Sequence, residues 1–274
     1  MLNGMSSYRK FLEVICGEMH RVLPFYLVTE VDMAAAEALR RDFVHAGRHV
    51  TYTAMVLKAI SRGIAELRVR YPVLNAHYLR FPFRRLIPAR ELKAAVMVAR
   101  EVCGEDYVFA GTVSDPQVMG LERISSLLAE FAEARPDGTP EFRDQLRFSR
   151  LPLFLQRVLF FAMRNLAGVR AKYHGTFGLT TVGKFGPDIQ IPPTMNPVSF
   201  AFGSIRQRVV AVDGCAEVRP AMFLTVTSDR RVLNGAPGAQ LLMRIRQILE
   251  AADFGERPMP SRAPAPERRE PACV

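Results

Sequence analysis

The chain has 274 residues, of which 49% are hydrophobic, so it is long and apolar enough to bury the core of a globular protein of enzyme size. Its four cysteines form no CxxC pair and no uncharged stretch reaches the length of a membrane span, which argues against a disulfide framework, a zinc site or an integral membrane protein. The formal net charge is +10, but the basic residues, mostly arginine, are dispersed along the chain and no nucleic-acid-binding motif is present, so we expect a solvated surface. Residues 1–12 show no signal-peptide pattern, so we expect a cytoplasmic protein.

The first half of the chain alternates between helical and strand patterns. Residues 26–32 alternate as a half-buried strand does, and Asp32 is a suitable cap for the helix that follows. The Ala134 to Pro140 stretch, ARPDGTP, predicts a loop within one domain. Helices are predicted at 8–23, 33–45, 53–71 and 121–133, and further strands at 78–81, 94–99 and 107–113.

The segment from Leu151 to Leu166 is the most apolar part of the chain. It is too short to span a bilayer and carries Arg157 and Arg164. Two alternatives follow: a helix buried against neighbouring helices or a partner subunit, which is the commoner outcome, or an interfacial helix in peripheral contact with an anionic membrane.

The last third is rich in strand patterns. Strands are predicted at 176–182, 198–205, 209–212, 216–218 and 222–226, followed by a helix at 236–250. The pair Asp213-Gly214 predicts a two-residue hairpin turn. From Phe254 onward, proline and charge predict a disordered tail, so we expect a single domain over residues 1–253 and a tail over 254–274.

Several stretches of the last third together resemble a known family. Residues 175–186, GTFGLTTVGKFG, resemble the strand and turn in the catalytic domain of 2-oxoacid dehydrogenase acyltransferases, the E2 components, which are similar in fold to chloramphenicol acetyltransferase. The stretches FGSI, VVAVDG, RPAM and LTV follow in the family's order, and SDRRVLNG at 228–235 lies where the family has Asp-His-Arg-x-x-Asp-Gly. Upstream, Arg9-Lys10 and YPVLNA at 71–76 resemble further landmarks.

The resemblance implies a two-layer α/β (α+β) fold with a mixed sheet, a homotrimer with sites between subunits, acyl-CoA as co-substrate and no metal. In the family, the motif histidine deprotonates the acceptor, an aspartate four residues later maintains the site, and a Ser or Thr stabilises the oxyanion. Here Thr180 matches the oxyanion residue, and the resemblance places Arg230 and Asn234 at the other two positions. We expect Thr181, Gly183 and Ser228 to contact the cofactor.

Two of these positions depart from the family pattern. Arg230 replaces the histidine, and a guanidinium group cannot act as a general base near neutral pH. Asn234 replaces the aspartate, keeping its shape without its charge. Among other bases, His174 is nearest in sequence but should lie about 20 Å from Thr180 along a strand. His20, His45, His49 and His77 lie in the N-terminal half, and a base from a neighbouring subunit stays open.

Three functions therefore remain. In the first, the chain is a diverged acyl-CoA-dependent acyltransferase acting on a small-molecule or carrier-bound acceptor. In the second, it is a non-catalytic relative that binds acyl-CoA or co-assembles with an active homologue. In the third, which we favour least, it catalyses another reaction in the same channel. In the second, Arg230 is a fixed cation for a phosphate or carboxylate, with an ordinary salt bridge as its plain alternative. We see no lipoyl domain in the sequence.

Overall fold

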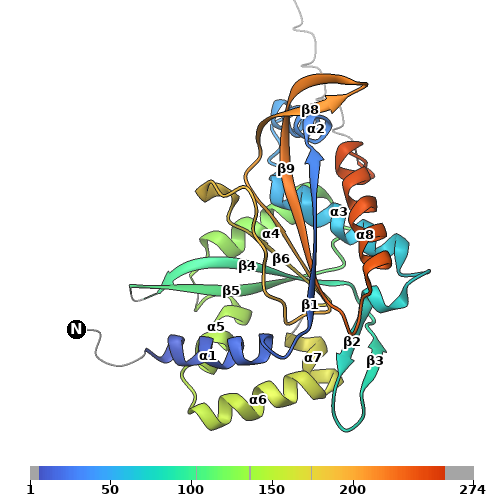
Figure 1. Ribbon diagram of the computed structural model, residues 1–274. Helices are drawn as coiled ribbons and strands as arrows, with labels where there is room; N and C mark the ends of the chain where they lie inside the picture. Colours follow the sequence, from blue (N-terminus) through green and yellow to red (C-terminus); the bar gives the residue numbers. More distant parts are fainter. Residues whose placement is uncertain (1–5, 103, 136, 174, 257–274) are drawn as a thin grey trace, which may run out of the picture.

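The computed structural model describes residues 6–256 except 103, 136 and 174. Its helices and strands lie in a mixed α/β arrangement, with α1 and α6 at one end of the sheet and the β8–β9 hairpin at the other (Figure 1). The α-helices are α1 (Ser7–Met19), α2 (Ala34–His45), α3 (Tyr52–Leu67), α4 (Leu121–Glu133), α5 (Pro140–Ser149), α6 (Leu153–Asn165), α7 (Ala167–Tyr173) and α8 (Gly235–Glu250). The strands are β1 (Pro24–Asp32), β2 (Ala76–Leu79), β3 (Arg85–Pro88), β4 (Lys93–Val102), β5 (Glu105–Ser114), β6 (Phe177–Thr181), β7 (Val198–Phe202), β8 (Arg206–Val212) and β9 (Cys215–Asp229).

The main sheet has seven strands in the order β1-β9-β7-β6-β4-β5, with β8 paired to β9. The β4–β6 and β6–β7 pairs are parallel and the other pairs are antiparallel, so the sheet is mixed, as predicted. A separate two-stranded sheet joins β2 and β3. Strand β9 organises the main sheet, because its first half pairs with β8 and its second half lies between β1 and β7.

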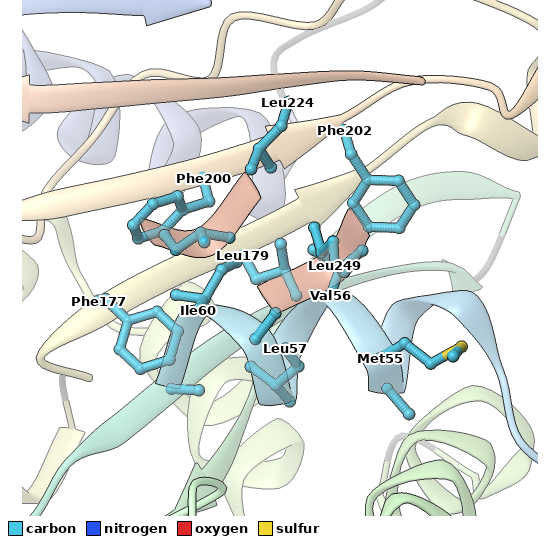
Figure 2. Packing of buried hydrophobic residues seen from close by; sticks show 14 of the residues in the cluster. Met55, Val56, Leu57, Ile60, Phe177, Leu179, Phe200, Phe202, Leu224 and Leu249 are labelled. Atoms are coloured by element: carbon cyan, nitrogen blue, oxygen red, sulfur yellow. The ribbon is translucent and has the colours of Figure 1, made fainter. Parts of the chain in front are cut away.

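The core lies where α3 and α8 cover one face of the sheet. Leu57 and Ile60 of α3 and Leu249 of α8 are fully buried, against Leu179 and Phe200 of the sheet (Figure 2). Burying such a side chain stabilises the fold by about 1.5–3 kcal/mol. The opposite sheet face is free of these helices, and it carries the small polar side chains described below.

Helix α6 packs one face on α1 and exposes the other. Phe160 and Met163 join Tyr8 and Phe11 of α1 in a small second cluster, whereas Phe154 remains 66% exposed. The predicted helix is therefore half-buried within one chain. Among the described residues, no helix is long and apolar enough to cross a membrane.

Several features differ from the prediction. The loop predicted up to Pro140 ends at Thr139, because Pro140 is the first residue of α5. Proline is favourable there, since the N–H groups of the first helical turn have no partner within the helix. Helices α5 and α7 and strand β3 were not predicted, since short segments give weak periodic signals. The strands predicted at 216–218 and 222–226 are one strand, β9, because Pro220 is accommodated opposite Gln207 of β8.

The hairpin turn is confirmed, and the tail boundary is wrong. Asp213 and Gly214 both have positive φ, 49° and 83°, as a type I′ turn requires. Phe254 is 1% exposed, and the Glu256 carboxylate accepts a hydrogen bond from Leu121 N at 2.9 Å at the start of α4. The packed domain therefore extends through Glu256, and the rest of the expected tail lies outside the described residues.

Candidate functional site

Thr180 lies near the C-terminal end of β6 on the sheet face away from α3 and α8. It is half-buried, and its hydroxyl has no hydrogen-bond partner among the described residues. Strand pairing places it beside Ala201 of β7, which in turn pairs with Thr225 of β9. A free hydroxyl on a rigid strand is suited to donate one hydrogen bond to a developing oxyanion.

The turn after Thr180 is fixed by internal hydrogen bonds. The Thr181 hydroxyl donates to Phe202 O at 3.0 Å and accepts from Gly183 N at 3.1 Å, and Gly183 O accepts from the Ser204 hydroxyl at 2.9 Å. A Cβ on Gly203 would lie 1.8 Å from Asp188 O, so two backbones meet where only glycine fits. In this structure, Thr181 and Gly183 shape the turn that supports Thr180.

The motif 228–235 begins at the other end of the sheet, where β9 ends. Ser228 is fully buried, and its hydroxyl donates weakly to Leu233 O at 3.4 Å. That burial keeps Ser228 from contacting a ligand within one subunit, contrary to the expected cofactor role. Asp229 is 4% exposed and holds Arg231 through a bidentate ion pair, with Oδ1–Nε at 2.8 Å and Oδ2–Nη2 at 2.6 Å.

Arg230 is oriented differently from its two neighbours. Its backbone N donates to Leu23 O at 2.9 Å, which continues the β1–β9 pairing. Its side chain is exposed and has no ion pair among residues of the described chain. Asn234 is the exposed N-cap of α8, and its side chain makes no capping hydrogen bond. Arg230 and Asn234 thus flank one tight turn as two free polar groups.

Thr180 and Arg230 do not meet within one subunit. Register places Thr180 level with Thr225 on β9, and Arg230 lies five residues further along the chain, just past the end of that strand. At about 3.3 Å per residue and about 4.8 Å per strand, their Cα atoms are about 19 Å apart. The two side chains therefore do not contact each other within one copy of the chain.

A pocket beside Asp229 gathers several arginines, most of which lie outside the sequence motif. Arg170 of α7 is 6% exposed; burial lowers its pKa to about 10, and the negative charge of Asp229 partly offsets this. The guanidinium donates to Met195 O at 3.1 Å, while its buried Nε has no partner among the described residues. The pocket is also lined by Glu18, Arg21, Tyr78, Arg80, Arg164 and Arg231. Only Asp229 and Arg231 carried a motif signal.

None of the four histidines with described side chains is placed as an evident base. His77 on β2 is 4% exposed; burial, helped by Arg170 and Lys93, lowers its pKa to about 4, so it is neutral near pH 7. His20, His45 and His49 are exposed. His174, the nearest candidate in sequence, lies outside the described residues.

Comparison with known proteins agrees with this arrangement. Residues 163–254 match the family model of the 2-oxoacid dehydrogenases acyltransferase (catalytic domain). A solved probable dihydrolipoamide acetyltransferase from Listeria monocytogenes superposes with a TM-score of 0.66 at 17% identity, covering 91% of this chain and 94% of that one. The chain has the acyltransferase catalytic-domain fold. The resemblance seen in the sequence is confirmed.

Two further relatives refine the comparison. The dihydrolipoyllysine-residue succinyltransferase component of the 2-oxoglutarate dehydrogenase complex of Bartonella vinsonii is 28% identical over 228 residues, 81% of this chain and 46% of that protein. This acyltransferase-like chain thus spans less than half the length of that relative. The Azotobacter vinelandii dihydrolipoamide acetyltransferase, with a TM-score of 0.63 at 16% identity over 89% of both chains, was solved to study a serine, a histidine and an asparagine in its catalytic mechanism. Its asparagine lies four residues after its histidine.

Proposed function

We propose that the chain is a diverged acyl-CoA-dependent acyltransferase that transfers an acyl group to a small-molecule or carrier-bound acceptor. The active site would form between subunits of a homotrimer, with Thr180 of one copy facing Arg230 and Asn234 of another. The observation that carries the proposal is the placement of these free polar groups at opposite ends of one rigid sheet, within an acyltransferase catalytic-domain fold.

Thr180 would supply the oxyanion contact. As the acceptor attacks the thioester carbonyl, negative charge develops on the carbonyl oxygen, and the unpaired Thr180 hydroxyl is free to donate to it. Thr181 and Gly183 would hold that hydroxyl in place through the turn. Ser228, being buried, would support the motif from beneath.

Arg230 would act as a fixed cation in place of the histidine. Its charge suits the oxyanion or a phosphate of CoA, but it takes no proton, so the acceptor must be deprotonated by another group or arrive as a thiolate. Loss of a general base costs about 10²–10⁴ in rate, whereas positioning supplies up to about 7–11 kcal/mol, so transfer without the histidine is physically feasible.

The position of Asn234 supports a catalytic function. It follows Arg230 by four residues, the spacing of the histidine and asparagine named for the Azotobacter vinelandii enzyme. An asparagine at this place is therefore compatible with acyl transfer in a protein of this fold. The curated relatives are succinyltransferase components, so succinyl-CoA and a dihydrolipoyl acceptor belong in the first panel of substrates.

A non-catalytic function is the second candidate, and Arg230 is the observation that favours it. The chain would then bind acyl-CoA, or co-assemble with an active homologue, without turning over. A substrate assay with a binding measurement separates the two functions.

The experiment measures acyl transfer from a panel of acyl-CoAs, with calorimetric CoA binding, for wild type, Arg230→His and Thr180→Ala. We expect measurable wild-type transfer, a gain of about 10²-fold or more in Arg230→His, and a loss of about 10²-fold in Thr180→Ala. Arg123→His, an exposed change on α4, is the matched control and should leave the rate unchanged. CoA binding without transfer to any acceptor would support the non-catalytic function, and no CoA binding would leave only a structural partner.

A further inference from the structure

The positive charge of the chain comes from two segments without acidic residues. Residues 67–90 contain six arginines, and residues 145–187 contain five arginines and two lysines. Together they carry 13 of the 37 basic residues and none of the 27 acidic ones, so the rest of the chain has 24 basic against 27 acidic residues. The dispersed charge expected from the sequence is therefore wrong.

The fold brings these two segments side by side. The first contains β2, β3 and their connection, and the second contains α6 and α7; the β2–β3 hairpin and α6 lie at the same end of the molecule (Figure 1). Phe81 of the hairpin connection contacts Phe161 of α6, with ring centroids 5.7 Å apart. The β2–β3 connection and α6, which are far apart in the sequence, thus adjoin on one surface.

Apolar side chains project from this surface between the arginines. Exposed fractions are 77% for Phe83, 66% for Phe154 and 59% for Val158, the last two being one turn apart on α6. Such large apolar groups are costly to leave in water and indicate a binding surface. We call the set the basic apolar face: Phe81, Phe83, Arg84, Arg85, Phe154, Arg157, Val158 and Phe161.

The arginines of this face are not neutralised. Arg84, Arg85 and Arg157 are exposed, and none has an acidic partner among the residues that the structure describes. At the edge of the face, the pocket described above adds Arg80 and Arg164, and the buried Nε of Arg164 has no acceptor within the described chain. The acids of that pocket are Glu18, which pairs with Arg164, and Asp229. Guanidinium groups with free N–H donors favour phosphate oxygens as partners.

We propose that the basic apolar face docks onto the surface of an anionic lipid bilayer. The phenylalanine and valine side chains would enter the interfacial region, and the surrounding arginines would contact lipid phosphates, as for an interfacial amphipathic helix. A two-fold contact with a second copy of the chain fits this face less well, because it would bring the same unpaired arginines against one another.

The test is vesicle co-sedimentation of the full chain. We expect binding to phosphatidylcholine vesicles containing 30% phosphatidylglycerol (about a third of the lipid, enough for a strongly negative surface potential), weak binding to pure phosphatidylcholine, and release at high salt. The variants Phe83→Ser/Phe154→Ser and Arg84→Gln/Arg85→Gln each remove two exposed groups of the face. Arg84→Gln/Arg85→Gln should bind at least about tenfold more weakly, since each basic group near the surface contributes about a factor of five. Phe83→Ser/Phe154→Ser should also bind at least about tenfold more weakly, since interfacial binding scales with the buried apolar area.

Matched controls change exposed apolar and basic residues elsewhere. Val209→Ser/Val218→Ser removes two exposed apolar groups of the β8–β9 hairpin, and Arg123→Gln removes an exposed charge on α4. Both should bind like wild type, with unchanged circular dichroism in all variants. The proposal is overturned if anionic vesicles do not bind the chain, if the face variants bind as well as the controls, or if Phe83→Ser/Phe154→Ser dissociates an oligomer, which would make the face a contact between copies.

Discussion

Asp229 neutralises the arginines at the end of β9, and its loss should be costly. It pairs directly with Arg231, whose side chain is 27% exposed, and faces Arg170, which is almost fully buried. Asp229→Asn would leave both cations without their counter-charge. We expect the free energy of unfolding to fall by about 3 kcal/mol, the usual cost of removing one partner of a buried pair.

Urea denaturation of Asp229→Asn beside Asp253→Asn measures this effect. Asp253 pairs with Arg62 at 3.1 Å, but the aspartate side chain is 52% exposed, so its loss should cost less than about 1 kcal/mol. Equal destabilisation by the two substitutions would show that burial of the Asp229 cluster contributes nothing.

His77 makes stability depend on pH. Burial lowers its pKa to about 4 in the folded chain, whereas in the unfolded chain the pKa is about 6.5. Between these values the unfolded state binds the extra proton, so stability is fully present above about pH 6.5 and falls by up to about 3 kcal/mol as pH drops to about 4.

Denaturation of wild type and His77→Gln at pH 4.5 and pH 7 measures that dependence (the two values bracket most of the window set by the pKa values, about 4 and 6.5). The difference in unfolding free energy between the two proteins should change with pH, because glutamine does not titrate. His45→Gln, at an exposed position of α2, should track wild type at both values. A constant difference for His77→Gln would contradict the low pKa of the buried imidazole.

At the scale of elements, the turn after β6 depends on a close approach of two backbones. A methyl group on Gly203 would lie 1.8 Å from Asp188 O, so Gly203→Ala must displace the loop that supports Thr180. We expect a loss of about 2–3 kcal/mol in stability. Gly17→Ala in α1 meets nothing within 4 Å and should instead stabilise the chain by about 0.5–1 kcal/mol. Thermal unfolding of both variants decides this, and a neutral Gly203→Ala would contradict the packing at the turn.

Most elements could be predicted because their patterns are local and periodic. Helix α4 was predicted at its observed bounds, and the Asp213-Gly214 turn follows from the backbone freedom of its residues. Helices α5 and α7 and strand β3 were missed because short segments show only a weak period. That residues 215–229 form one strand, β9, depends on pairing with β8 and β1, which lie elsewhere in the sequence. Local sequence patterns therefore predict most helices and strands, whereas pairing with distant strands decides whether two predicted strands form one.

At the scale of the whole molecule, the position of the candidate site could be predicted from the sequence, but not all of the residues that surround it. The motif located the ends of β6 and β9 because its glycines and strand pattern are local. Arg170 escaped notice because its relation to Asp229 arises from tertiary packing across 59 positions of sequence. The proposed contact of Thr180 with Arg230 would need a second copy of the chain, because register holds the two residues about 19 Å apart in one subunit.

The central claim, a site completed by a second copy of the chain, can be tested without any assay of activity. Thr180→Cys and Arg230→Cys are made separately in a background where the four native cysteines are serine, and the two proteins are mixed, reassembled and treated with a short bis-maleimide. The account predicts a cross-linked species of two chains in the mixture, and none within a chain that carries both cysteines. A cross-link within one chain, or a monomer that forms no cross-link between chains, would contradict it.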